Sequence, residues 1–165
     1  MLYIKEITSQ MSQKELSDIG RELLLEGLRL EYGISDLPEI SFKEFGKPYF
    51  KDYTDIHFNI SHCGKAVACL LSEEEVGVDV EEIKEFDREL AEYVCSPHEF
   101  KKVLESEDPE VAFISLWTRK ESYFKFTGKG LDSREEIRNS SGDKSCRFYT
   151  CVNKSAGYIV TTCTK

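Results

Sequence analysis

Two carboxylates, Asp79 and Glu81, lie one residue apart in a segment that is otherwise hydrophobic. Because strand side chains alternate between faces, Val78 and Val80 would point into the core and the two acids to the opposite face. The rise of a strand puts the Cα atoms of the acids about 6.6–7 Å apart. Oxygen ligands of this kind suit a hard cation such as Mg²⁺. By itself, the pattern is more often a solvated polar face at the end of a strand.

A second candidate site is the helical spacing of Trp117, Glu121 and Lys125, which recur every four residues with Lys120 beside them. Residues four apart share one face of a helix. A carboxylate between two lysines suits a site that holds both a cation and phosphate oxygens. For one helix taken alone, a surface Glu–Lys pair with the tryptophan in the core is the more frequent arrangement.

The third candidate is the segment Phe58–His62, which reads as a strand. Phe58 and Ile60 alternate toward the core, so Asn59 and Ser61 would share the other face. His62 follows at the strand end, where a ligand could reach it. The alternative is a turn capped by the asparagine and serine, with an exposed histidine.

The elements that must position these residues give a mixed pattern. Ser12 and Glu15 form a capping-box signature that opens a helix ending at Gly33. Start signals at Ser96 and Asp108 predict helices to Leu104 and to about Phe126. Strands are predicted over 2–7, 40–45, 56–61, 66–71, 76–80, 146–152 and 158–163, a solvated turn over 72–75 and a loop over 132–145. We therefore expect an α+β fold of two related lobes, about 1–74 and 75–165, each with a long helix on a small, mostly antiparallel sheet.

Composition excludes several classes of protein. The chain has 165 residues, of which 40% are hydrophobic, so a core can form and global disorder is excluded. With 22 basic and 31 acidic residues the net charge is −9, which argues against a general nucleic-acid binder. The sequence has no apolar run that could span a membrane and no signal-peptide layout, so we expect a cytoplasmic protein. Six cysteines without a CxxC pair argue against a structural zinc site.

Four motifs occur together in an order that is specific: Gly46-Lys47-Pro48, Phe58–His62, Gly77–Glu81 and Trp117-x-x-Lys120-Glu121-Ser122-x-x-Lys125. This set resembles the 4′-phosphopantetheinyl transferases, and among them the type that activates surfactin-synthetase-like assembly lines. The resemblance implies the transferase fold, with coenzyme A in a cleft between two lobes. It also implies the activity: Mg²⁺-dependent transfer of 4′-phosphopantetheine from coenzyme A to a serine of an apo acyl or peptidyl carrier protein, with release of 3′,5′-ADP.

The resemblance also assigns roles to individual residues. Asp79, Glu81 and Glu121 would hold Mg²⁺ against the pyrophosphate, and Glu121 or a water on the metal would accept the serine proton. Glu121 and Lys125 are the implied catalytic residues. The residues implied at coenzyme A are Arg21, Lys47, Ser61, His62, Lys120 and Lys125. Carboxylates and lysines in one cleft fit this chemistry, because they can bind a metal and stabilise phosphoryl charge.

Two other functions stay open at this point. A metal-dependent phosphodiesterase or nuclease also uses clustered acids with a lysine, but it needs a basic binding face, and the net charge of −9 argues against one. A degenerate transferase-like domain would bind coenzyme A or a carrier protein without turnover. Two lobes in one chain favour a monomer, with a dimer as the alternative, and we expect neither nucleic acid nor membrane as a partner.

Overall fold

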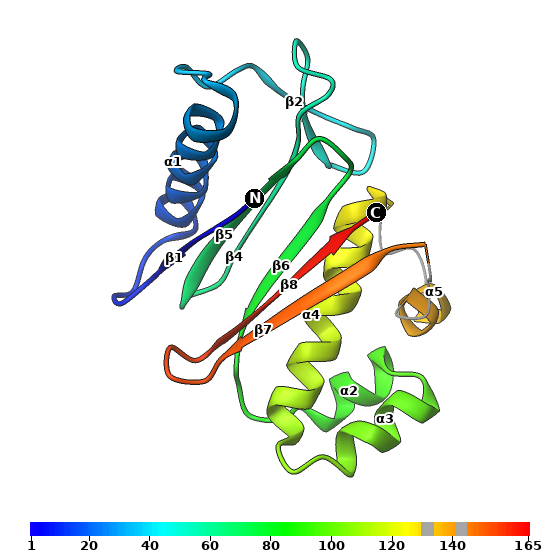
Figure 1. The fold of residues 1–165 in the computed structure, drawn as a ribbon. Helices are drawn as coiled ribbons and strands as arrows, with labels where there is room; N and C mark the ends of the chain where they lie inside the picture. Colours follow the sequence, from blue (N-terminus) through cyan, green and yellow to red (C-terminus); the bar gives the residue numbers. More distant parts are fainter. Residues whose placement is uncertain (130–133, 141–144) are drawn as a thin grey trace.

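The computed structural model describes residues 1–129, 134–140 and 145–165, and these residues form an α+β fold (Figure 1). The helices are α1 (Gln13–Tyr32), α2 (Arg88–Val94), α3 (Pro97–Leu104), α4 (Pro109–Thr127) and α5 (Arg134–Asn139). The strands are β1 (Leu2–Glu6), β2 (Ile40–Phe42), β3 (Pro48–Phe50), β4 (His57–His62), β5 (Ala66–Ser72), β6 (Gly77–Glu82), β7 (Arg147–Asn153) and β8 (Tyr158–Thr164). The predicted fold class is confirmed.

Two antiparallel sheets, each covered by one long helix, carry the architecture. The N-terminal sheet has the strand order β1-β5-β4 and packs against α1, whereas the C-terminal sheet has the order β6-β8-β7 and packs against α4. Strands β2 and β3 form a separate hairpin, and α2 and α3 lie beside the first half of α4 (Figure 1). The division of the chain into related lobes at about residue 74 stays a prediction.

Helix α1 begins and ends where the sequence predicts. Ser12 and Glu15 form the reciprocal capping box, and Gly33 adopts the left-handed conformation, φ 69°, that ends the helix. Its apolar face packs on the N-terminal sheet and forms one core with that sheet. The buried apolar residues of α1 are Leu16, Ile19, Leu23, Leu24 and Leu28.

The two sheets meet where β4 runs beside β6, and side chains rather than a backbone ladder join these strands. The Oδ1 atom of Asn59 accepts a hydrogen bond from the Val78 backbone N–H at 3.0 Å. The hydroxyl of Ser61 accepts one from the Val80 N–H at 3.3 Å. A second hydrophobic cluster packs the sheets together and includes Ala66, Ala68, Leu70, Val78, Val80 and Val160. The polar residues of β4 therefore align the two halves of the chain.

Three parts of the predicted pattern differ from the structure. The loop expected over 132–145 contains α5, whose buried Ile137 packs into the core beside α4; residues 132–133 and 141–144 lie outside the described residues. Helix α2 and strand β3 were not predicted, although Asp87 caps α2 by accepting from the Leu90 N–H. Both elements are short, so packing rather than local sequence stabilises them. None of the described helices is long and apolar enough to cross a membrane.

Candidate active site

A glycine allows the closest approach between β6 and α4. A Cβ atom on Gly77 would lie 2.1 Å from the Ser122 carbonyl oxygen and 2.4 Å from the Phe126 nitrogen. Only a residue without a side chain fits there, because real Cβ atoms do not approach backbone atoms so closely. The backbone of α4 consequently lies against β6, and the acids Asp79 and Glu81 face that helix.

Asp79 is the centre of a buried polar network. Its Oδ1 atom accepts hydrogen bonds from the Lys125 ammonium at 2.6 Å and from the Ser61 hydroxyl at 3.0 Å. The same ammonium donates to the Ser61 oxygen at 2.9 Å. The Oδ2 atom is buried and has no hydrogen-bond partner among the described residues. A buried carboxylate oxygen without a partner is costly, so this atom is suited to receive a ligand.

Glu81 and Glu121 complete a group of three carboxylates. Burial raises the pKa of both side chains, and the negative charge of Asp79 raises each pKa further. A hydrogen bond from Trp117 lowers the pKa of Glu81, and the Lys125 charge lowers that of Glu121, but neither effect outweighs the burial. The three carboxylates therefore repel one another, and a bound cation would relieve that repulsion.

These carboxylates fit a hard divalent cation, although their side chains do not yet converge on one point. Among the described residues, no three His, Cys, Asp or Glu side chains are arranged around a common metal position. Three observations support a cation here: the ligands would all be oxygen atoms, the three carboxylates repel one another, and the Oδ2 atom of Asp79 has no hydrogen-bond partner among the described residues.

A groove leads from this cluster across the junction of the sheets. A cavity of about 340 Å³ lies between the two halves of the chain, and its walls include Pro48 and Ile60 on one side and Glu121 and Lys125 on the other. A second cavity, of about 480 Å³, shares Pro48 and Ile60 and extends to α1. Its walls also include Ser17, Arg21, Leu37, Phe42 and His62. The two cavities together are large enough for an extended ligand.

Lys120 lies away from this groove, contrary to the role that the resemblance implies. Its side chain is 1% exposed, and the ammonium donates to the Glu99 carboxylate at 3.0 Å, the Ile137 carbonyl at 2.8 Å and the Arg138 carbonyl at 3.0 Å. Burial lowers its pKa, and the ion pair with Glu99 opposes that shift. All three protons of the ammonium are used, so Lys120 holds α3 and α5 against α4.

Lys47 lines the groove with its stem only. Its ammonium is buried, donates to the Phe126 carbonyl at 2.6 Å and the Val76 carbonyl at 3.2 Å, and pairs with Glu75. The aliphatic stem packs at Gly128, where an added Cβ would lie 3.0 Å from the lysine Cδ. Lys47 thus ties β3 to the C-terminal end of α4, and its charge is not presented to the groove.

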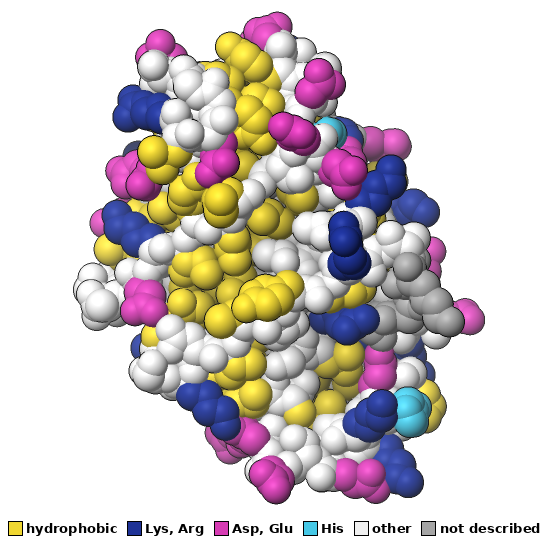
Figure 2. All heavy atoms as spheres, in the orientation of Figure 1, with side chains coloured by type: hydrophobic (Ala, Val, Ile, Leu, Met, Phe, Trp, Pro, Cys, Tyr) yellow, Lys and Arg dark blue, Asp and Glu magenta, His cyan; other side chains and the backbone are white. Residues whose placement is uncertain are grey.

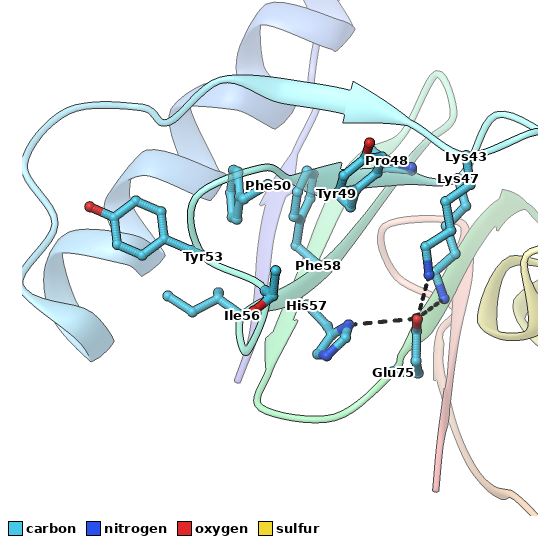
Figure 3. A pocket seen from close by; sticks show the side chains of 11 residues that line it. Lys43, Lys47, Pro48, Tyr49, Phe50, Tyr53, Ile56, His57, Phe58 and Glu75 are labelled. Carbon is cyan, nitrogen blue, oxygen red and sulfur yellow. Dashed lines mark hydrogen bonds and ion pairs between the residues drawn. The ribbon is translucent and has the colours of Figure 1, made fainter.

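Glu75 belongs to an ion cluster, and the expected solvated turn over 72–75 is wrong at this position. Figure 3 shows Lys43, Lys47 and His57 directed toward its carboxylate. The Lys43 ammonium lies 2.7 Å from one carboxylate oxygen, and the His57 Nδ1 lies 3.7 Å from the other. Burial alone would raise the pKa of Glu75, but hydrogen bonds from the two lysines lower it.

Two contacts in this region were missed by reasoning from the sequence. Glu99 was assigned only to the capping box of α3, which it does form with Ser96, yet it also pairs with Lys120. Trp117 shares a helix face with Glu121, as the spacing predicts, and packs against the core beside α4, but the sequence did not predict that its indole donates to Glu81. The helical spacing of Trp117 and Glu121 carried a signal for the second of these contacts, because it put the indole on the face of the acids.

Comparison with known proteins identifies the family. The model of the 4′-phosphopantetheinyl transferase superfamily matches residues 75–163. The chain is 40% identical over 93 residues to the 4′-phosphopantetheinyl transferase Sfp of Bacillus subtilis (strain 168), covering 55% of the chain and 42% of the relative. It is 41% identical over 124 residues to the 4′-phosphopantetheinyl transferase gsp of Aneurinibacillus migulanus, covering 70% of the chain and 52% of the relative. The chain thus spans about half the length of the curated relatives it matches. On this evidence, the chain belongs to the 4′-phosphopantetheinyl transferase superfamily.

Proposed function

We propose that this chain transfers the 4′-phosphopantetheine group of coenzyme A to a serine of an apo acyl or peptidyl carrier protein, with Mg²⁺ as the cation. The observation that carries the proposal is the meeting of Asp79, Glu121 and Lys125 at one end of a groove between two sheets. The relatives named 4′-phosphopantetheinyl transferases support the same activity.

The carboxylates of Asp79, Glu81 and Glu121 would hold the cation. Once bound, it would neutralise charge on the pyrophosphate of coenzyme A. Lys125 has the position for a second positive charge on the same phosphates, since its ammonium already lies within the acid cluster and its side chain is 30% exposed. The carrier serine Oγ attacks the β-phosphorus, the bond from that phosphorus to the bridging oxygen breaks, and 3′,5′-ADP departs with the electron pair.

Glu121 is the side chain that we propose as acceptor of the serine proton. It lines the groove, where the serine hydroxyl would approach the pyrophosphate, and a carboxylate within hydrogen-bond reach can accept that proton. At the far end of the groove, Arg21 and His62 supply a guanidinium and an imidazole for the phosphate of the nucleotide. Pro48 and Ile60 between them offer apolar walls against which a base can pack.

The charge of the chain, −9 in total, argues against a nucleic acid as partner. On the face drawn in Figure 2, lysine and arginine side chains lie among aspartates and glutamates and do not form a continuous basic stripe. A nuclease needs such a stripe to bind the phosphate backbone. We further propose that the enzyme works as a monomer, because the two sheets on either side of the groove belong to the same chain.

Intact-mass spectrometry tests the proposal. A panel of apo carrier proteins is incubated with this protein, coenzyme A and Mg²⁺, and a known transferase serves as the positive control. We expect at least one carrier to gain one phosphopantetheine, and the gain to vanish in EDTA and with Asp79→Ala. Glu82→Ala is the matched control, because this neighbouring acid lies on the opposite face of β6 from Asp79 and Glu81. In the strand register it lies across from Tyr158 of β8. Coenzyme A binding without any transfer would instead support a degenerate domain.

A further inference from the structure

The hydroxyl of Ser61 lies at the centre of the contacts that join the two halves of the site. It donates to Asp79 Oδ1 at 3.0 Å and accepts from the Lys125 ammonium at 2.9 Å. It also accepts from the Val80 backbone N–H at 3.3 Å. Ser61 belongs to β4 of the N-terminal sheet, whereas all three of its partners belong to the C-terminal half.

These three contacts use the full capacity of the group. A hydroxyl has one proton to donate and two lone pairs that accept. The proton of Ser61 is committed to Asp79, and both lone pairs are occupied. A phosphate oxygen needs a donor, so Ser61 could contact a phosphate only by giving up the aspartate.

We infer that Ser61 is a positioning residue for the proposed cation site and not a ligand of the nucleotide phosphates. This inference rests on the proposed function, because it concerns the same site. By holding Oδ1 of Asp79, the hydroxyl fixes the rotation of the carboxylate and leaves Oδ2 for the cation, since none of the residues that the structure describes bonds to that oxygen. Partners of this kind around metal ligands are worth about 10-fold to 100-fold in metal affinity.

Asn59 shows which part of this arrangement is specific to Ser61. Two residues earlier on β4, the Asn59 side chain accepts from the Val78 N–H, just as Ser61 accepts from the Val80 N–H. Both residues therefore hold β4 beside β6. Of the two, Ser61 is the one whose side chain also bonds to Asp79 and Lys125. The hydrogen bond from Val80 to Ser61 thus places the serine hydroxyl next to Asp79.

Two binding experiments without turnover separate this role from that of a phosphate ligand. Mn²⁺ binding is measured from the electron paramagnetic resonance signal of the free ion, and 3′,5′-ADP binding by calorimetry in EDTA. For Ser61→Ala we expect Mn²⁺ affinity to fall by about 10-fold or more, and 3′,5′-ADP affinity to stay at the wild-type value. Ser61→Thr, which keeps the hydroxyl, should restore Mn²⁺ binding. Ser122→Ala is the matched control, since it removes a buried hydroxyl that donates to the Arg119 carbonyl of its own helix and, among the described residues, makes no hydrogen bond to the acid cluster.

The opposite pattern would overturn the inference. Wild-type Mn²⁺ affinity with loss of 3′,5′-ADP binding in Ser61→Ala would make the residue a phosphate ligand. If Ser61→Ala does not fold, the threonine variant decides: a folded Ser61→Thr with weak Mn²⁺ binding would also refute the role of the hydroxyl. Failure of the proposed function is a separate result, namely no mass gain on any carrier with the wild-type protein, and it leaves the two binding measurements interpretable.

Discussion

Replacement of Lys120 by methionine distinguishes a structural lysine from a phosphate-binding one. The methionine fills a similar volume but cannot donate a hydrogen bond. It leaves the Glu99 carboxylate and the Arg138 carbonyl without the donor that they have in the native protein. The Ile137 carbonyl keeps a partner, because it also accepts from the Ser140 hydroxyl at 2.9 Å. The damage is therefore confined to one ion pair and one carbonyl.

The expected loss of stability follows from these contacts. Removal of one partner from a buried ion pair costs about 3–5 kcal/mol. Glu99 retains a hydrogen bond from the Ser96 N–H at 2.8 Å, and its side chain is 15% exposed, so the lower end of that range applies. A loss of about 3 kcal/mol corresponds to a fall in Tm of about 6–12 °C for a chain of this size.

Urea unfolding followed by circular dichroism measures the loss, and calorimetry with coenzyme A at low temperature measures binding by the folded variant. Coenzyme A affinity should stay near the wild-type value. Lys101→Met on α3 is the control, because the side chains of its ion pair with Glu105 are 71% and 65% exposed, and we expect no measurable change. Wild-type stability together with lost coenzyme A binding in Lys120→Met would refute the reasoning.

Three further predictions concern the acid cluster. Gly77→Ala places a Cβ against the backbone of α4, so both the melting temperature and the transfer rate should fall, and retention of both would contradict the close packing. Because burial and the Asp79 charge raise the pKa values of Glu81 and Glu121, their ionised forms oppose folding. The metal-free protein should therefore gain stability as pH falls from neutral through these raised pKa values. Mg²⁺ should raise the Tm at neutral pH. A Tm that changes neither with pH nor with Mg²⁺ would argue against the cluster. Lys125→Ala removes the ammonium from Asp79 and the groove, so the KM for coenzyme A should rise, and steady-state kinetics with an unchanged KM would contradict its proposed role.

Local sequence signals predicted helix α1 and the two elements that carry the acid cluster, β6 and α4. The capped ends of α1 and α4 and the alternation along β6 are local signals, and the structure confirms all three. The helical spacing of Glu121 and Lys125 put both residues on one face, and they line the same cavity. These predictions succeeded because each depends on residues that are close together in sequence.

The environment of the lysines was not predictable in this way. Lys120 is adjacent to Glu121 in sequence, but successive residues of a helix point about 100° apart. Its direction leads to α3 and α5, and α5 was itself expected to be loop. The contacts of Lys47 depend on two carbonyls far away along the chain, Val76 and Phe126. Motif spacing contains no information about such partners.

The most direct test of the account is a crystal structure of the protein grown with Mn²⁺ and coenzyme A, with the anomalous signal of manganese used to locate the ion. The account predicts a peak about 2.1 Å from Asp79 Oδ2, with Glu81 and Glu121 turned toward it. Coenzyme A should lie in the groove between Pro48 and Ile60 with its pyrophosphate at the ion. A manganese peak away from these carboxylates, or coenzyme A bound outside the groove, would contradict the central claim.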